Sequence, residues 1–273
     1  MTTSQTTYPK FTMGAELTGE QIQFFQENGF IHFKKFINAD KVKQSMEGLM
    51  DLQARWIAEG RKIVNGVPLK FGFDEHNNKI IHRFAFTSMY SEVFKELVND
   101  TRMKSFSQLL GRPDARLGVN EKDGVVVNQY INTGLSKMKQ MGWHTDSLRD
   151  VFFGQKVMPM LNVGLNLTDS KKEQGGLRII PETHKQSLYS MLFKKPYFVN
   201  NEPDKNEVAV ETDAGDLTIH HGHMWHRVET AHTTGARSRR ITMYVPVICG
   251  KYVPRDEHSV TPFYHRLNAL AKK

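Results

Sequence analysis

The amino-acid sequence predicts a mainly β protein with flanking helices, folded as a single domain over residues 1–273. Three observations lead to this prediction. Helix-capping signals and apolar spacing typical of helices occupy residues 15–112. From about residue 115 to about residue 250, alternation of apolar and polar residues replaces the helical spacing and predicts a β core. No repeat and no linker rich in Gly, Ser and Pro divides the chain, and β-rich domains of this length are common.

The N-terminal part contains clear signals for helix starts and ends. Thr18 followed by Gln21 is a capping-box pattern, and Gly29 can adopt the left-handed conformation that ends a helix, so we expect a helix over residues 18–28. Further elements are predicted as a strand at 30–33, a long amphipathic helix capped by Asp40 and running to about Ala58, and short helices at 91–98 and 102–110.

The clearest strand covers residues 161–168, where Leu161, Val163 and Leu165 alternate with small or polar residues. Other strands are predicted at 125–131, 177–180, 216–221 and 239–248. Residues 64–79 and 191–208 lack periodicity and are expected to be long loops. Such loops often cover binding sites.

Composition argues against several classes of protein. The net charge is +8, but the Lys and Arg residues are scattered along the chain, so nucleic-acid binding is not favoured. The chain lacks both a bilayer-spanning apolar run and the apolar core of a signal peptide, so we expect a cytoplasmic protein without a membrane partner. The single cysteine, Cys249, cannot build a thiolate cage, and any metal must therefore be held by histidine and carboxylate.

A candidate metal site begins at Trp143-His144-Thr145-Asp146. Residues i and i+2 of a strand project from the same face and can hold one ion together. Such a His-x-acid pair is expected about once by chance in a chain of this composition, so it is weak evidence alone. His226, about 80 residues later, supplies a second imidazole. Two histidines and one carboxylate are the ligand set of non-haem iron(II) oxygenases, which keep open positions for co-substrates.

A basic segment, Arg237-Ser238-Arg239-Arg240, begins eleven residues after His226. A guanidinium can bind a carboxylate through two parallel hydrogen bonds. Arg237 and Arg239 would share one face of a strand, so either could point into a site. Arginines on an exposed strand are the alternative interpretation.

These motifs resemble the phytanoyl-CoA dioxygenase family, a branch of the iron(II)- and 2-oxoglutarate-dependent oxygenases. The resemblance extends over most of the chain. It rests on Leu17-Thr18-Gly19-Glu20-Gln21, Glu27-Asn28-Gly29-Phe30, Trp143-His144-Thr145-Asp146, Gly175-Gly176-Leu177-Arg178-Ile179-Ile180-Pro181-Glu182-Thr183-His184-Lys185, Gly215-Asp216, His221, His226 and Arg237. Glu182 and Thr183 depart from the family pattern, which usually has Gly and Ser there.

The resemblance implies a double-stranded β-helix, a cupin-like jelly roll, with the N-terminal helices as a buttress. It implies Fe(2+) on His144, Asp146 and His226, with 2-oxoglutarate and O2 as co-substrates. The oxoglutarate carboxylate would bind Arg237, with Arg239 as the other candidate.

The resemblance also implies polar contacts to oxoglutarate from the segment before the metal motif. The available matches are Asn128, Gln129, Asn132 and Thr133. His221 matches a family histidine and is expected near the cofactor, whereas His220, His223 and His232 are expected at the surface or as supporting groups.

The implied reaction hydroxylates, desaturates or cyclises a small organic substrate and releases succinate and CO2. Halogenating relatives carry a small residue where this chain has Asp146, which favours hydroxylation. Lys194, Lys195 and Lys205 in the predicted loop suggest an anionic substrate. The sequence does not indicate an oligomeric state.

Three other functions remain open from the sequence. A zinc hydrolase or a cupin-type dioxygenase could use the same ligands without oxoglutarate. A nucleic-acid demethylase could use the same cofactors. A jelly-roll binding module would take up no metal.

Overall fold

The N-terminal helices begin where side chains satisfy their free backbone N–H groups. In a computed structural model, which describes residues 8–136, 138–147, 157–196, 198, 200–262 and 265, α1 (Gly19–Asn28) is closed by the predicted capping box of Thr18 and Gln21. Helix α2 (Ala39–Ala58) is capped by Asn38, whose side chain accepts a hydrogen bond from the backbone of Lys41. The prediction that Asp40 caps this helix was wrong, because residue 40 already lies in its first turn.

The remaining helices are short. They are α3 (Thr87–Tyr90), α4 (Glu92–Asn99), α5 (Thr101–Ser105), α6 (Leu188–Phe193) and the 3-10 turns η1 (Phe106–Leu110), η3 (Lys172–Gln174), η4 (Thr183–Lys185) and η5 (Gly235–Ser238). The helix predicted over 102–110 is therefore divided into α5 and η1, and it ends at Gly111 in the left-handed conformation. None of the helices in the described part is long and apolar enough to cross a membrane.

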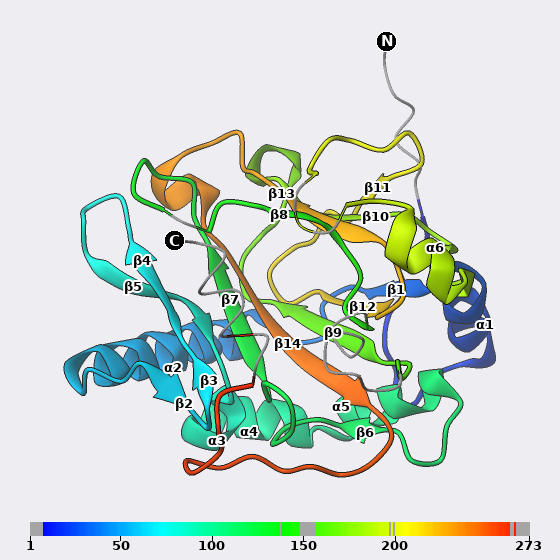
Figure 1. The fold of residues 1–273 in the computed structure, drawn as a ribbon, viewed down its shortest axis with the longest axis horizontal. Coiled ribbons are helices and arrows are strands. Elements are labelled where there is room, and N and C mark those ends of the chain that lie inside the picture. Colours follow the sequence, from blue (N-terminus) through cyan, green and yellow to red (C-terminus); the bar gives the residue numbers. More distant parts are fainter. Residues whose placement is uncertain are drawn as a thin grey trace.

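Two antiparallel sheets form the core (Figure 1). The larger sheet has the order β1 (Phe30–Phe33), β12 (Leu217–His221), β9 (Leu161–Asn166), β14 (Arg240–Ile248), β7 (Val126–Tyr130), β5 (Lys79–Phe84) and β4 (Lys70–Phe73), with β6 (Arg116–Leu117) paired to β14. The smaller sheet has the order β11 (Val208–Ala209), β10 (Gly176–Ile179), β13 (His226–Glu229) and β8 (Met141–His144). A hairpin of β2 (Ile63–Val64) and β3 (Val67–Pro68) stands apart from both.

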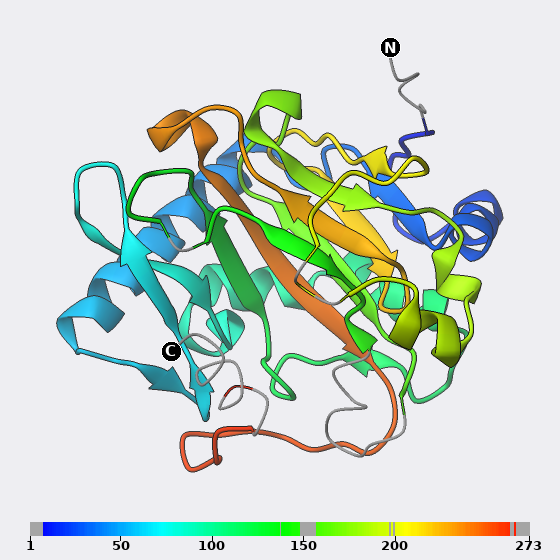
Figure 2. The ribbon, with the colours of Figure 1, turned by 45° about the horizontal axis from the view of Figure 1, so that its top comes forward.

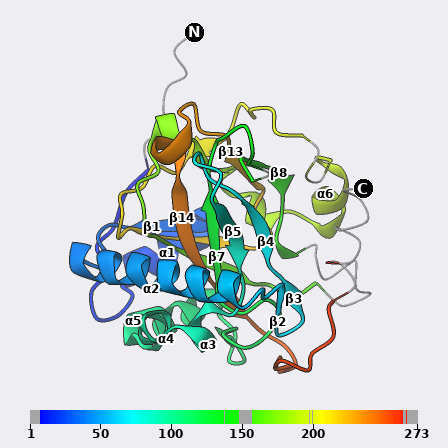
Figure 3. The same ribbon diagram turned by 90° about the vertical axis from the view of Figure 1, so that its left-hand side faces the viewer.

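The larger sheet has one apolar face and one polar face. Leu161, Val163 and Leu165 of β9 point to the core that includes Leu49 and Trp56 of α2. Figure 3 shows α2 along this side of the sheet, with α3, α4 and α5 beside it. The smaller sheet lies over the other face (Figure 2). The predicted mainly β fold, a cupin-like jelly roll with helices on one side, is confirmed.

The two predicted loops have different outcomes. Residues 64–79 contain part of the separate β2–β3 hairpin and also β4, which extends the larger sheet, so the prediction of a loop there was wrong. Strand β4 is a short edge strand, and Gly72 at its centre leaves room for the His82 ring, since a Cβ there would lie 2.1 Å from Nε2 of His82. The alternation of apolar and polar residues in β4 is therefore too short and irregular to predict a strand. Within 191–208, α6 runs to residue 193 and β11 begins at 208, and the described residues between them form a loop as predicted. Residues 197 and 199 lie outside the described part.

Candidate functional site

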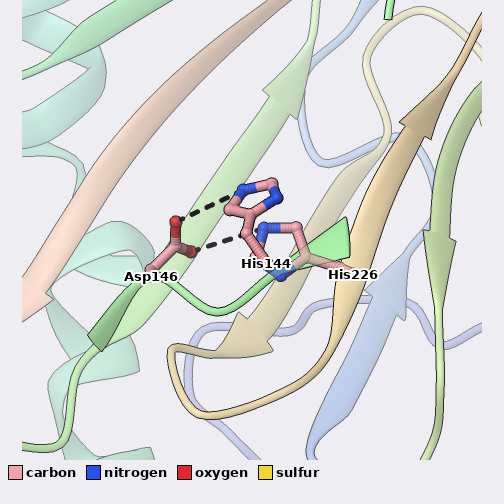
Figure 4. A group of neighbouring side chains, drawn as sticks. All are labelled: His144, Asp146 and His226. Carbon is pink, nitrogen blue, oxygen red and sulfur yellow. Dashed lines mark ion pairs between the residues drawn. The ribbon is translucent and has the colours of Figure 1, made fainter. Parts of the chain in front are cut away.

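The candidate metal ligands meet on the smaller sheet. His144 ends β8, His226 begins β13, and the two residues are direct partners in the antiparallel pairing of these strands. Asp146 follows two residues after His144. The Nε2 atoms of His144 and His226 lie 3.9 and 3.7 Å from the Asp146 carboxylate oxygens (Figure 4). One ligand atom from each of the three residues falls within 4.8 Å of the others. This spacing leaves room for a single ion with ligand bonds of about 2 Å.

Both imidazoles present Nε2 to this point. Nδ1 of His144 lies 2.8 Å from the carbonyl oxygen of Gly142, and Nδ1 of His226 lies 3.0 Å from that of Met224. Because a carbonyl oxygen only accepts, each Nδ1 carries the hydrogen and each Nε2 keeps its lone pair. Burial lowers the pKa of both histidines, which favours the neutral, metal-binding form.

The third ligand remains ionised. Burial alone would raise the pKa of Asp146, but the nearby ring of His226, a hydrogen bond from His220 and the ring of His144 together hold that pKa well below its usual range. Asn162 of β9 also donates to Oδ2 of Asp146, at 3.0 Å. A carboxylate that accepts hydrogen bonds from two side chains keeps a fixed orientation.

Two buried tryptophans lie on the side of the smaller sheet opposite the metal ligands. Trp143 and Trp225 immediately precede the ligands and therefore point to the opposite side of the small sheet, where they cluster with Ile180. The indole of Trp225 donates to Gln186, and its backbone N–H donates to the hydroxyl of Thr183. This hydrogen bond beside His226 uses the hydroxyl of Thr183, which the serine usual at this position in the family would also offer.

Arg240 lies on the polar face of the larger sheet, where the two sheets meet. It is 5% exposed, and Nη2 donates to the carbonyl oxygen of Glu229 at 2.9 Å. Its guanidinium lies 5.1 Å from the ring centre of Tyr130. Among the described residues, Nε has no hydrogen-bond partner and no carboxylate lies within 4.0 Å of the guanidinium. Burial lowers the pKa of Arg240, as expected for a charge without a counter-ion.

The other two arginines lie elsewhere. Arg237 is exposed in the η5 turn, so it does not share a strand face with Arg239 as expected. Arg239 is half-buried and lies 3.5 Å from a carboxylate oxygen of Glu75, away from the cavity. The reason is that β14 begins at Arg240, because residues 235–238 form a 3-10 turn.

A cavity of about 170 Å³ opens next to the metal ligands. Its wall includes Asn128, Tyr130 and Tyr244 from the larger sheet and Met141 from β8. Burial raises the pKa of Tyr244 to about 12 and raises that of Tyr130 further, so both phenols remain protonated hydrogen-bond donors at neutral pH. A second, much smaller space continues from it past Tyr130 and Tyr244 to Arg240.

Of the four polar candidates before the metal motif, the structure brings Asn128 to the cavity. Gln129 faces the other side of β7 and donates to the carbonyl oxygen of Ile81. Asn132 lies beyond the end of β7, where its amide donates to the carbonyl oxygens of Ala231 and Thr233. Thr133 is buried in the following turn and does not line the cavity.

Of the two neighbouring histidines of β12, His220 and not the expected His221 lies near the metal ligands. His220 is 2% exposed and its Nε2 lies 3.4 Å from Oδ2 of Asp146, so this residue faces the metal ligands. His221 is on the opposite face, near His184 and His223, and does not line the cavity.

The sequence signal that could have found His220, Asn162 and Arg240 is the polar half of each strand alternation. Each of the three is adjacent to an apolar residue that faces the helices: Asn162 lies between Leu161 and Val163, His220 follows Ile219, and Arg240 precedes Ile241. Lys195, one of the lysines expected to contact substrate, is instead paired with Asp204 at 2.6 Å. Lys194 and Lys205 are exposed.

Solved structures with the same fold include several non-haem iron enzymes. The chain matches the non-heme alpha ketoglutarate dependent carbocyclase SnoK from nogalamycin biosynthesis at 18% identity, with a TM-score of 0.62 over 89% of this chain and 89% of that one. It matches EctD from S. alaskensis, solved with 2-oxoglutarate and 5-hydroxyectoine, at 17% identity and a TM-score of 0.62 over 85% and 76% of the two chains. The non-heme alpha ketoglutarate dependent epimerase SnoN gives 16% identity and a TM-score of 0.60 over 84% and 82%.

Sequence comparison gives the family. No curated protein sequence matches the chain. Residues 25–241, which include all three candidate metal ligands and Arg240, match the family model described as Phytanoyl-CoA dioxygenase (PhyH). The resemblance inferred from the motifs is confirmed, and the chain belongs to the phytanoyl-CoA dioxygenase family.

Proposed function

We propose that this protein is an iron(II)- and 2-oxoglutarate-dependent oxygenase that hydroxylates a small organic substrate, or desaturates or cyclises it after the same hydrogen abstraction. In the hydroxylation, one oxygen atom of O2 enters the product and the other enters succinate, with loss of CO2. The observation that carries the proposal is the convergence of His144, Asp146 and His226 beside a buried arginine that has no carboxylate partner in the described part of the chain.

The donor set fits iron(II). Two neutral imidazoles and one carboxylate on one side of an ion leave its other positions open for co-substrates. Bound there, iron(II) supplies the oxidising chemistry that breaks an unactivated C–H bond, using 2-oxoglutarate and dioxygen. The protein holds the ligands in place: Gly142 and Met224 fix the imidazoles, while His220 and Asn162 fix Asp146.

Arg240, rather than Arg237 or Arg239, is the proposed anchor for 2-oxoglutarate. A buried guanidinium without a counter-ion is unfavourable, and a bound carboxylate would satisfy it through charge-assisted hydrogen bonds. Thr242 and Tyr130 line the same small space and offer hydroxyl groups beside the arginine. The tyrosines and apolar side chains around the cavity would limit water near the reacting carbon.

The test is oxoglutarate turnover by protein supplied with iron(II), ascorbate and 2-oxoglutarate. We expect succinate formation by the unaltered protein and none by His144→Ala or Asp146→Ala. His76→Ala is the matched control, because that side chain is 77% exposed and remote from the metal ligands, and it should keep full activity. Full activity of either ligand variant would remove the metal assignment.

Metal uptake separates the alternatives. A zinc hydrolase or cupin-type dioxygenase would bind metal through the same residues but form no succinate from 2-oxoglutarate. A binding module would take up no iron, and its melting temperature would not respond to iron and 2-oxoglutarate.

A further inference from the structure

A second arginine faces the cavity at a distance from the oxoglutarate anchor. Arg83 lies on β5, and its direct partner across the strand pairing is Asn128 of β7. Directly paired residues project to the same face of a sheet, here the face toward the metal ligands. Both side chains line the cavity that contains His144, Asp146 and His226.

The guanidinium of Arg83 is held on one side and lacks a partner on the other. Nη2 donates to Oδ2 of Asp123 at 2.7 Å, while Oδ1 of Asp123 lies 3.2 Å from Nε2 of His265. Nη1 of Arg83 is buried and has no hydrogen-bond partner among the described residues. The ion pair therefore fixes the orientation of the guanidinium and leaves one edge available.

The side chain of Asn128 also has a buried polar atom, Oδ1, without a hydrogen-bond partner in the described part of the chain. A buried polar atom without a partner is unfavourable, so two such atoms on directly paired residues of one cavity wall indicate that a ligand satisfies them. The required ligand carries an acceptor for the arginine and a donor for the amide oxygen.

Building on the proposed function, we propose that Arg83 and Asn128 bind the substrate, and that the substrate is a small carboxylic acid with an amino or hydroxyl group next to its carboxylate. The carboxylate accepts from Nη1 of Arg83, and the neighbouring amino or hydroxyl group donates to Oδ1 of Asn128. Because both residues share the cavity with the metal ligands, a substrate bound at this end would reach toward the metal with its other end.

This site is distinct from the oxoglutarate anchor. Arg240 lies in the smaller space reached past Tyr130 and Tyr244, whereas Arg83 lines the main cavity. Two arginines with separate pockets can bind two different acids in one site. Binding of an acidic substrate in this way does not require the lysines of residues 191–208.

The experiment measures binding of paired probes to protein loaded with Mn(II) and 2-oxoglutarate. The probes are 2-amino and 2-hydroxy acids of three to eight carbons, each compared with its methyl ester by calorimetry. We expect at least one acid to bind while its ester does not. Arg83→Met should weaken binding of that acid at least about thirtyfold, the usual effect of removing one partner of a buried charged hydrogen bond. Arg83→Lys should give an intermediate loss, since lysine keeps the charge without the planar fork.

Controls separate this proposal from the one on which it rests. Arg112→Met removes an arginine that is also paired with an aspartate, but at the surface, and it should leave acid binding unchanged. The affinity for 2-oxoglutarate should be the same in Arg83→Met as in the unaltered protein. If Arg83→Met does not fold, Arg83→Lys and Asn128→Leu provide the same comparison.

The outcomes are distinct. If no acid binds more tightly than its ester, or if the Arg83 variants bind the acid normally, the substrate assignment is wrong even when succinate is formed. If Arg83→Met loses 2-oxoglutarate binding, Arg83 belongs to the co-substrate site and the assignment is again wrong. Failure of the proposed function would appear separately, as absence of metal binding and of succinate.

Discussion

The larger sheet has two faces of opposite character. Toward the helices, Leu165 of β9 and Ile219 of β12 are completely buried among aliphatic and aromatic side chains. On the same two strands, His220 faces the cavity and Asn166 faces the smaller space that continues from it. Adjacent residues on these two strands thus have different surroundings.

This difference separates stability from function. Each buried apolar side chain on the helix side contributes roughly 1.5–3 kcal/mol to folding. The cavity side carries buried polar atoms that have no hydrogen-bond partner within the described ranges, among them Nε of Arg240 and Oδ1 of Asn128, and each of them costs stability. The apolar face therefore stabilises the fold. This stability allows the cavity face to carry buried polar groups that are unfavourable until a ligand binds.

The largest effect on stability is expected on the helix side. Leu165→Ala should lower the free energy of unfolding by about 2–5 kcal/mol, because it leaves a cavity in the central strand of the packed face. The KM for 2-oxoglutarate of the remaining folded protein should stay unchanged. Urea unfolding measures the first quantity and succinate formation the second. Leu188→Ala, at a position 48% exposed, is the matched control and should change stability by less than about 0.5 kcal/mol.

Arg240→Met should have the opposite effects, with weaker binding of 2-oxoglutarate and no loss of stability. Binding of 2-oxoglutarate should weaken by roughly a hundredfold, since a buried charged hydrogen-bonding partner is lost. Stability without co-substrate should be equal or higher, because an uncompensated buried charge is replaced by an apolar side chain. Thermal unfolding with and without 2-oxoglutarate measures both effects. Arg237→Met is the control, and if it rather than Arg240→Met lost oxoglutarate binding, the exposed arginine would be the anchor.

The alternation over residues 161–168 was sufficient to predict both faces of that strand, because a buried face requires apolar residues at every second position. Helix α1 was equally predictable, since the capping box and Gly29 act through local backbone geometry. The metal ligands could be proposed because their residue types and spacing follow from coordination chemistry.

The identity of the cavity residues depended on register, which the sequence does not reveal. A shift of one residue moves every side chain of a strand to the other face. The η5 turn delays the start of β14, so the spacing of eleven residues led to the exposed Arg237 instead of the buried Arg240. The same uncertainty made His221 rather than His220 the expected neighbour of the cofactor. Arg83 was missed because it lies on β5, whose first residue fell in a predicted loop.

The smallest predicted effect concerns His221, which lies on the helix side of β12. Burial, followed by the nearby rings of His223, His184 and His220, lowers the pKa of His221 to about 3. The unfolded chain, with a histidine pKa of about 6.5, therefore binds this proton more readily than the folded protein. Stability is fully present above pH 6.5 and decreases as the pH falls from there toward 3, by up to about 1.4 kcal/mol per pH unit.

His221→Asn should reduce this pH dependence. Asparagine does not titrate, and its side-chain oxygen can accept the hydrogen bond that the backbone of His223 now donates to Nδ1 of His221. Urea unfolding at pH 7.5 and pH 5.5 should give a smaller difference for the variant than for the unaltered protein. Part of the difference should remain, because burial also lowers the pKa of His32, His184 and His223. An unchanged difference would mean that His221 becomes protonated without unfolding, and that the helix side of β12 is more open to water than its packing indicates.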